Sequence, residues 1–126
     1  MSLTDGQQAL IRRIVEMTRT AGVVLPNGKD APLPRYVIQA AGGTQRTATI
    51  GGKTEATPEI VVRVETMQGD YATDNDALVS DLVDLFAVND RFECVTILDA
   101  PLPRPPLPVV DGVYSVPVII RGRTYF

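Results

Sequence analysis

The fold is decided by residues 59–86, EIVVRVETMQGDYATDNDALVSDLVDLF, in which a strand pattern is followed by a helix pattern. Ile60, Val62 and Val64 alternate with mostly charged residues, which predicts a strand with one buried face. From about Thr73 onward, apolar residues recur at helical spacing and form one broad face: Leu78, Val79, Leu82, Val83, Leu85 and Phe86. A strand followed by an amphipathic helix predicts that the helix packs across a sheet.

The second helix is expected to begin at Thr73, because Thr73 and Asp76 resemble a capping box with aspartate in place of glutamate. Several aspartates lie in and around this helix: Asp70, Asp74, Asp76, Asp81 and Asp84. They lack the D-x-D-x-D-G spacing of a calcium loop, so we interpret them as a solvated acidic face and predict no metal site.

Upstream of this stretch, residues 4–21 are predicted to form a first helix. Its apolar stripe consists of Leu10, Ile11, Ile14, Val15, Met17 and Ala21. Its polar side, Arg12, Arg13, Glu16 and Arg19, is either a solvated face or a subunit contact. After a connector, RYVIQAA (35–41) and QRTATI (45–50) are predicted strands on either side of a turn at Gly42 and Gly43. GGKTEATP (51–58) is predicted to be a mobile loop.

Downstream, RFECVTILDA (91–100) and VYSVPVIIRG (113–122) are predicted strands. Pro117 cannot donate a hydrogen bond in a ladder, so the last strand is expected to lie at an edge or to carry a bulge, open to pairing with a neighbour. The predicted class is α+β, with an antiparallel or mixed sheet of about five strands and two helices, in the order α-β-β-β-α-β-β. Residues 1–126 have the length of one domain.

The segment APLPRPPLPVVDG (100–112) joins the last two predicted strands and has an unusual density of prolines: Pro101, Pro103, Pro105, Pro106 and Pro108. Such a sequence favours a stiff polyproline II rod. We interpret it as a rigid contact arm, because a stiff loop loses little entropy on docking. A simple spacer and a ligand for an SH3-like or WW-like groove are the alternatives.

Composition excludes several function classes. The chain has no histidine, which removes the commonest general base and metal ligand, and its one cysteine, Cys94, is expected to be a structural thiol. The net charge of −3 argues against a nucleic-acid reader. No apolar run is long enough to cross a bilayer, and the N-terminal residues show no leader pattern. Neither glycine pair is followed by GKS or GKT before a helix, and GGKT (51–54) lacks both the upstream glycine at the spacing of a phosphate-binding loop and the helix. We therefore predict no catalytic site, no cofactor and no membrane association.

These elements together resemble the tail terminator proteins of long-tailed, siphovirus-like bacteriophages. The resemblance rests on the N-terminal helix, on APLPRYVIQ (31–39), on the strand and acidic helix of residues 61–86, and on the ending DGVYSVPVIIRG (111–122) after a proline-rich stretch. It spans most of the chain, and the proline density of residues 101–108 departs from the family pattern. The resemblance implies a hexameric ring that caps the tail tube, ends its polymerisation and joins head-completion (stopper) proteins. Genomic DNA would pass through the lumen without specific binding.

The resemblance places the protein in the virion at the head–tail junction, made in the host cytoplasm. It carries over no catalytic residue. Candidate contact residues lie in the proline-rich segment, in the loop before the third strand and in the last strand: Pro101, Pro103, Arg104, Pro105, Pro106, Pro108, Gly51, Gly52, Lys53, Tyr114 and Pro117. The alternatives are a head-completion or neck connector of the same junction and a small cytosolic ligand-binding protein.

Overall fold

The computed structural model describes residues 3–18, 21–47, 54–93 and 95–125. It contains two α-helices, two short helical turns and seven strands. Their bounds are α1 Leu3–Met17, β1 Gly22–Val24, β2 Arg35–Thr47, β3 Thr54–Met67, the 3-10 turn Gln68–Asp70, the π turn Tyr71–Asn75, α2 Asp76–Leu85, β4 Arg91–Phe92, β5 Val95–Ile97, β6 Leu102–Pro103 and β7 Val113–Tyr125.

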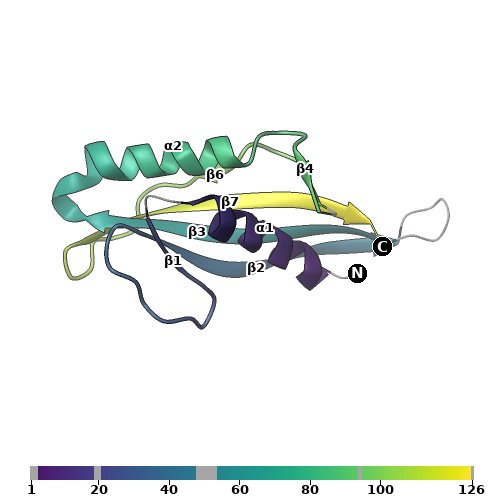
Figure 1. Cartoon of the computed structure of the whole chain (residues 1–126), viewed down its shortest axis with the longest axis horizontal. Helices are drawn as coiled ribbons and strands as arrows, with labels where there is room; N and C mark the ends of the chain where they lie inside the picture. The colour runs from purple at the N-terminus through teal and green to yellow at the C-terminus, as the bar shows by residue number, and fades with distance from the viewer. Residues whose placement is uncertain (1–2, 19–20, 48–53, 94, 126) are drawn as a thin grey trace.

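The strands form one sheet in the order β1-β2-β3-β7-β5-β4, and β6 pairs with β7 beside this path. β1 runs parallel to β2, and every other pairing is antiparallel, so the sheet is mixed. Figure 1 shows the long strands β2, β3 and β7 side by side, with α1 crossing them and α2 running along the sheet. The predicted α+β class is confirmed, with more strands than expected.

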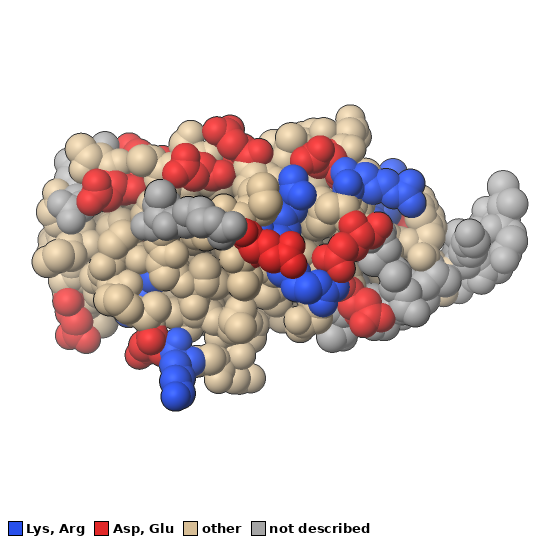
Figure 2. All heavy atoms as spheres, viewed as in Figure 1, with Lys and Arg blue, Asp and Glu red and all other residues tan. Residues whose placement is uncertain are grey.

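The helix α2 has the predicted polar face. Ser80, Asp81 and Asp84 are exposed, whereas Leu78 and Leu82 are buried. In Figure 2, acidic side chains gather along the top edge of the molecule, over α2, while basic and acidic side chains mix to the right of centre. The acidic face predicted for this helix is therefore present on the surface.

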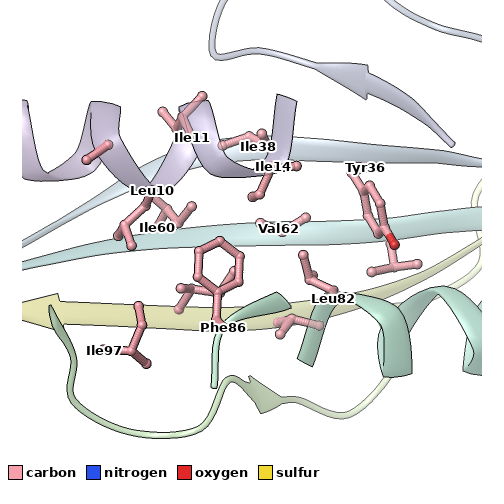
Figure 3. Packing of buried hydrophobic residues seen from close by; sticks show 14 of the residues in the cluster. Leu10, Ile11, Ile14, Tyr36, Ile38, Ile60, Val62, Leu82, Phe86 and Ile97 are labelled. Carbon is pink, nitrogen blue, oxygen red and sulfur yellow. The ribbon is translucent and has the colours of Figure 1, made fainter. Parts of the chain in front are cut away.

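The hydrophobic core lies between the two helices and one face of the sheet. Figure 3 shows Leu10 and Ile14 of α1, Val62 of β3, and Leu82 and Phe86 from α2 and its end pointing toward one another. All five are buried. Since odd and even residues of a strand point to opposite faces, this places the even positions of β3 in the core, as predicted.

The first helix is shorter than predicted and its apolar stripe is narrower. It ends at Met17, and Gly22 starts β1 instead of ending the helix. The side chains of Val15 and Met17 were wrongly placed in the stripe, because both are exposed.

Two arginines on the polar side of α1 contact other parts of the chain, so this side is not simply solvated. Arg13 donates through Nε to the carbonyl oxygen of Leu85 (3.0 Å) and through Nη2 to Asp90 (3.0 Å), and its guanidinium lies 4.4 Å from the ring centre of Phe92. Arg12 pairs with Glu93 at 2.6 Å. These contacts connect α1 to the end of α2 and to β4. Arg19 lies outside the described residues.

The predicted turn at Gly42 and Gly43 is wrong. β2 continues through both glycines as one strand, and the register against β3 shifts between Ala40 and Gly43. This is a β-bulge: one extra residue stands in β2, and φ is +80° at Gly42 and +132° at Gly43. The side chain of Gln7, which is buried in α1, donates to the bulged carbonyl of Gly42 at 2.7 Å.

Replacing Gln7 with alanine is expected to destabilise the protein by about 1–3 kcal/mol, because it leaves a carbonyl of the bulge without its donor. The measurement is the midpoint of urea unfolding. Gln8→Ala is the matched control, since Gln8 is the exposed neighbour on the same helix. Equal midpoints for the two variants would contradict a role for Gln7 in holding the bulge.

The loop predicted at 51–58 is also partly wrong. β3 begins at Thr54, and Ala56 is fully buried in it, so residues 54–58 are strand. Thr47 pairs with Thr54, so β2 and β3 form a long hairpin. Gly51, Gly52 and Lys53 lie outside the described residues.

The second helix does not begin with a capping box. The chain is already helical from Gln68 through the 3-10 and π turns, so Thr73 lies inside a helical turn. The start of α2 is instead held by Asn75, a buried residue whose Nδ2 donates to the carbonyl of Val64 (2.9 Å) and to Oγ1 of Thr66 (3.2 Å). A contact with β3 therefore replaces the local cap.

A second hydrogen bond between the sheet and α2 predicts that the stability of the protein depends on pH. The hydroxyl of Tyr36 donates to the carbonyl of Leu78 at 2.8 Å. Burial, together with the nearby carboxylate of Asp81, raises the pKa of Tyr36 to about 12. The folded pKa thus exceeds the ordinary tyrosine value of 10, so the stabilisation is complete below pH 10 and is lost as the pH rises through about 12.

We therefore expect the difference in unfolding midpoint between the parent protein and Tyr36→Phe to shrink as the pH rises from 10 through about 12. Urea titrations of both proteins across this window measure it. A difference that stays constant would show that the Tyr36 hydroxyl does not resist ionisation in the folded state.

The fourth and fifth predicted strands need two corrections. Residues 91–100 form two short strands, β4 and β5, which pair with each other, and Cys94 lies outside the described residues. The last strand, β7, is central rather than at an edge, and its register against β3 is continuous at Pro117. The carbonyl of Pro117 accepts from the amide of Arg104 (2.8 Å), so its ring nitrogen also faces residues 102–107. The proline therefore costs no hydrogen bond to β3.

Candidate interaction surface

The face of the sheet opposite the helices carries a row of charged side chains. Odd positions of β3 and β7 point to this face, and Arg63 lies opposite Pro117 and Glu65 opposite Ser115. We call it the open face. No α-helix among the described residues packs on it, so its polar residues are available for contacts unless the chain itself covers them.

At one end of the open face, Glu65 is hydrogen-bonded to Arg35 and Ser115. Its Oε1 accepts from Nε of Arg35 at 2.7 Å, and its Oε2 accepts from the hydroxyl of Ser115 at 3.3 Å. The Glu65 side chain is only 8% exposed. Arg35 is fixed further by a 2.7 Å hydrogen bond to the carbonyl of Ala31. Glu65 and Arg35 therefore form a rigid, mutually neutralising pair.

Arg63 stands beside this pair but is bound only loosely. Its Nε lies 3.9 Å from Oε2 of Glu65, beyond hydrogen-bond distance. That Nε is buried and has no hydrogen-bond acceptor. A buried donor without an acceptor is unfavourable, whereas other parts of the Arg63 side chain, which is 34% exposed, remain open to solvent.

The proline-rich segment lies along β7 and does not project as a free arm. Leu102 and Pro103 pair with β7, and the amides of Arg104 and Leu107 donate to the carbonyls of Pro117 and Ser115 at 2.8 and 2.9 Å. The segment returns through Asp111 and Gly112, both with positive φ as in a type I′ turn. Its backbone is therefore held, while most of its side chains are exposed.

An open pocket of about 490 Å³ lies where this segment meets the open face. Arg35, Arg63, Glu65 and Ser115 form its polar part, and Leu107, Pro108, Val110 and Val113 form its apolar part, with Asp111 beside them. We call this the Arg63 pocket. Met67, Leu107, Val109 and Val110 are exposed large apolar residues at the same end of the sheet. Apolar and cationic groups thus converge at one place.

The predicted contact residues fall into three groups. Pro103, Arg104, Pro105, Pro106 and Pro108 are exposed, whereas Pro101 is buried and Tyr114 and Pro117 are half-buried. The glycines and lysine at 51–53 lie outside the described residues. Among the predicted contact residues that the structure describes, only Pro108 lines the Arg63 pocket. Sequence reasoning missed Arg63 and Glu65 as site residues, although their alternation with buried valines placed them together on the outer face.

The described ranges contain neither a metal-ligand cluster nor a membrane-spanning helix. Within them, no group of three or more acidic, cysteine or histidine side chains is arranged to hold a metal ion. No helix there is both long and apolar enough to span a bilayer.

Comparison with known proteins gives a fold likeness. No family model matches the chain, and no curated protein matches it. Among solved structures, a chain from the virion of a native gene transfer agent particle matches with a TM-score of 0.65 and 13% identity, over 99% of this chain and 98% of that chain. A second structure, whose name describes no function, matches with a TM-score of 0.61 and 22% identity, over 94% and 95% of the two chains. At these identities the likeness shows a shared fold.

Proposed function

We propose that this protein is a structural virion subunit, a tail terminator whose hexameric ring caps the tail tube, ends its polymerisation and joins the tail to head-completion proteins. The observation that carries the proposal is the fold likeness to a virion chain over almost the full length of both chains. The order of elements that resembles the tail terminator family supports the same role.

The strand arrangement supports ring formation, but the free edge belongs to β2 and not, as the sequence had predicted, to the last strand. β7 is central, but β1 covers only Arg35–Val37 of β2. In the described part of the sheet, residues 38–47 of β2 pair only with β3. A free edge of this length can pair with another subunit, and head-to-tail contacts of one subunit type close into a ring.

The surface charge is compatible with a channel for DNA. Each chain carries a net charge of −3, so a ring of several copies is acidic. Acidic walls repel the phosphate backbone and let DNA pass without being held. The proposed terminator role names three protein partners: other copies of this chain, the tail tube protein and a stopper protein. DNA would only pass through the lumen.

The test is to add the purified protein to tail tubes of the same particle and to measure molar mass by light scattering and tube ends by electron microscopy. Six-subunit caps at one end of the tubes and an arrest of their growth are the expected results. A protein that does not bind tail tubes but binds the portal side of the head–tail junction would be a neck connector. Binding to neither would contradict a junction role.

A further inference from the structure

We propose that the Arg63 pocket binds a short peptide segment of a neighbouring virion protein that presents a carboxylate beside a bulky apolar side chain. The virion role of the partner rests on the proposed function, whereas the chemistry of the pocket does not. Three features carry the inference: an unsatisfied arginine, a fixed pair of charges next to it, and an apolar rim.

The first feature is the orphaned donor of Arg63. Its Nε is buried without an acceptor, and the Arg63 side chain is 34% exposed, so part of it faces the pocket. Because Nε itself is closed to solvent, a ligand reaches Arg63 through the exposed part of its side chain. A carboxylate satisfies the planar fork of a guanidinium with two parallel hydrogen bonds.

The second feature is that the nearby carboxylates are engaged by other residues or only loosely paired with Arg63. Glu65 is engaged by Arg35 at 2.7 Å and by Ser115 at 3.3 Å, and it lies 3.9 Å from Arg63. Asp111, the other acidic residue of the lining, is exposed in its turn, where solvent screens its charge. In the inner part of the pocket, two arginines therefore share the single carboxylate of Glu65, which leaves an excess of positive charge there.

The third feature is the rim. Leu107 and Val110 line the pocket and are both exposed, and Val110 is 65% exposed. An isolated anion gains nothing from these residues. In a peptide with a leucine-like side chain next to a carboxylate, the apolar side chain can cover the rim while the carboxylate contacts Arg63. A pocket of about 490 Å³ is large enough for both side chains.

The charge complementarity selects the occupant. The pocket has its cationic group inside and its apolar groups outside, so the favoured segment has the acidic group directed inward. A second copy of this chain and a purely apolar peptide are the competing occupants. The experiment separates them from the occupant to which we commit.

The probe is the fluorescein-labelled peptide Leu-Glu-Leu-Glu-Leu with blocked ends, and its matched control is Leu-Gln-Leu-Gln-Leu. Fluorescence anisotropy with the full chain, without tubes, measures both. We expect the acidic peptide to bind at least about tenfold more tightly at low salt, and the preference to shrink as salt screens the charge. Equal affinities would overturn the proposal.

Two variants locate the binding. Arg63→Gln and Val110→Asp are each expected to weaken the acidic peptide about tenfold or more, whereas Arg91→Gln, a charge loss on the exposed edge of β4, is expected to have no effect. Circular dichroism checks that each variant is folded. If Arg63→Gln changes the self-association of the protein and not its peptide affinity, a second copy is the occupant and the proposal fails. Peptide binding by a protein that ignores tubes would retain the pocket chemistry and reject only the terminator role.

Discussion

Val62→Asp is expected to prevent folding. Val62 is fully buried in the middle of β3, between the two helices. A carboxylate there has no partner, and burying it costs more than several kcal/mol, whereas a domain of this size is stable by about 5–15 kcal/mol in total. The expected result is a protein that is insoluble or lacks a cooperative unfolding transition.

The matched control is Val61→Asp, because Val61 is the next residue of the same strand and points to the open face. Both variants add one charge and replace one valine in β3. We expect Val61→Asp to fold and to unfold cooperatively on heating. Cooperative unfolding of Val62→Asp at a similar temperature would contradict the assignment of even positions to the core.

The long elements could be predicted because their signals are local. The alternation in residues 59–66 and the apolar spacing in residues 76–86 each require one buried face, and the chain buries both faces in one core between α2 and the sheet. The α+β class followed from these two patterns. The same local reasoning could not show that β2 continues past Gly42, because the side chain that supports the bulge, Gln7, is 35 residues away.

The position of β7 in the sheet was predicted wrongly for a related reason. Pro117 suggested an edge strand, since proline lacks a donor, but the missing donor faces only the short segment at residues 102–107. Only the pairing of β7 with β3 on one side and with β5 and β6 on the other decides its place. The short strands β1 and β6 have no periodicity to detect, because two or three residues cannot show one.

The candidate site was the least predictable part. The Arg63 pocket joins residues from β2, β3, β7 and the segment before β7, which are adjacent only in the folded chain. Sequence analysis placed contacts in the proline-rich segment and interpreted it as an arm. The structure keeps this segment exposed but binds its backbone to β7, so its side chains, and not its length, are available to a neighbour.

This arrangement decides how the contact role is tested. Deleting residues 101–108 would also remove the backbone groups that pair with β7, so a defect would have two explanations. The variant carrying Arg104→Glu, Pro105→Ser and Pro106→Ser keeps the chain length and changes only exposed positions. We expect it to fold with a melting temperature within a few degrees of the parent and to lose tube capping.

The expected loss of capping follows from the chemistry of the three residues. Arginine is enriched at interface centres, and single anchors there contribute about 2 kcal/mol or more, so the triple change should weaken binding to tube ends more than about tenfold. Serines also loosen the segment, which increases the entropy lost on docking.

Electron microscopy of tube ends across a protein titration measures the effect. Arg91→Glu makes the same charge change at a distant exposed edge and should cap normally. Normal capping by the triple variant would mean that the ring meets the tube through another surface, of which the free edge of β2 is the first to examine.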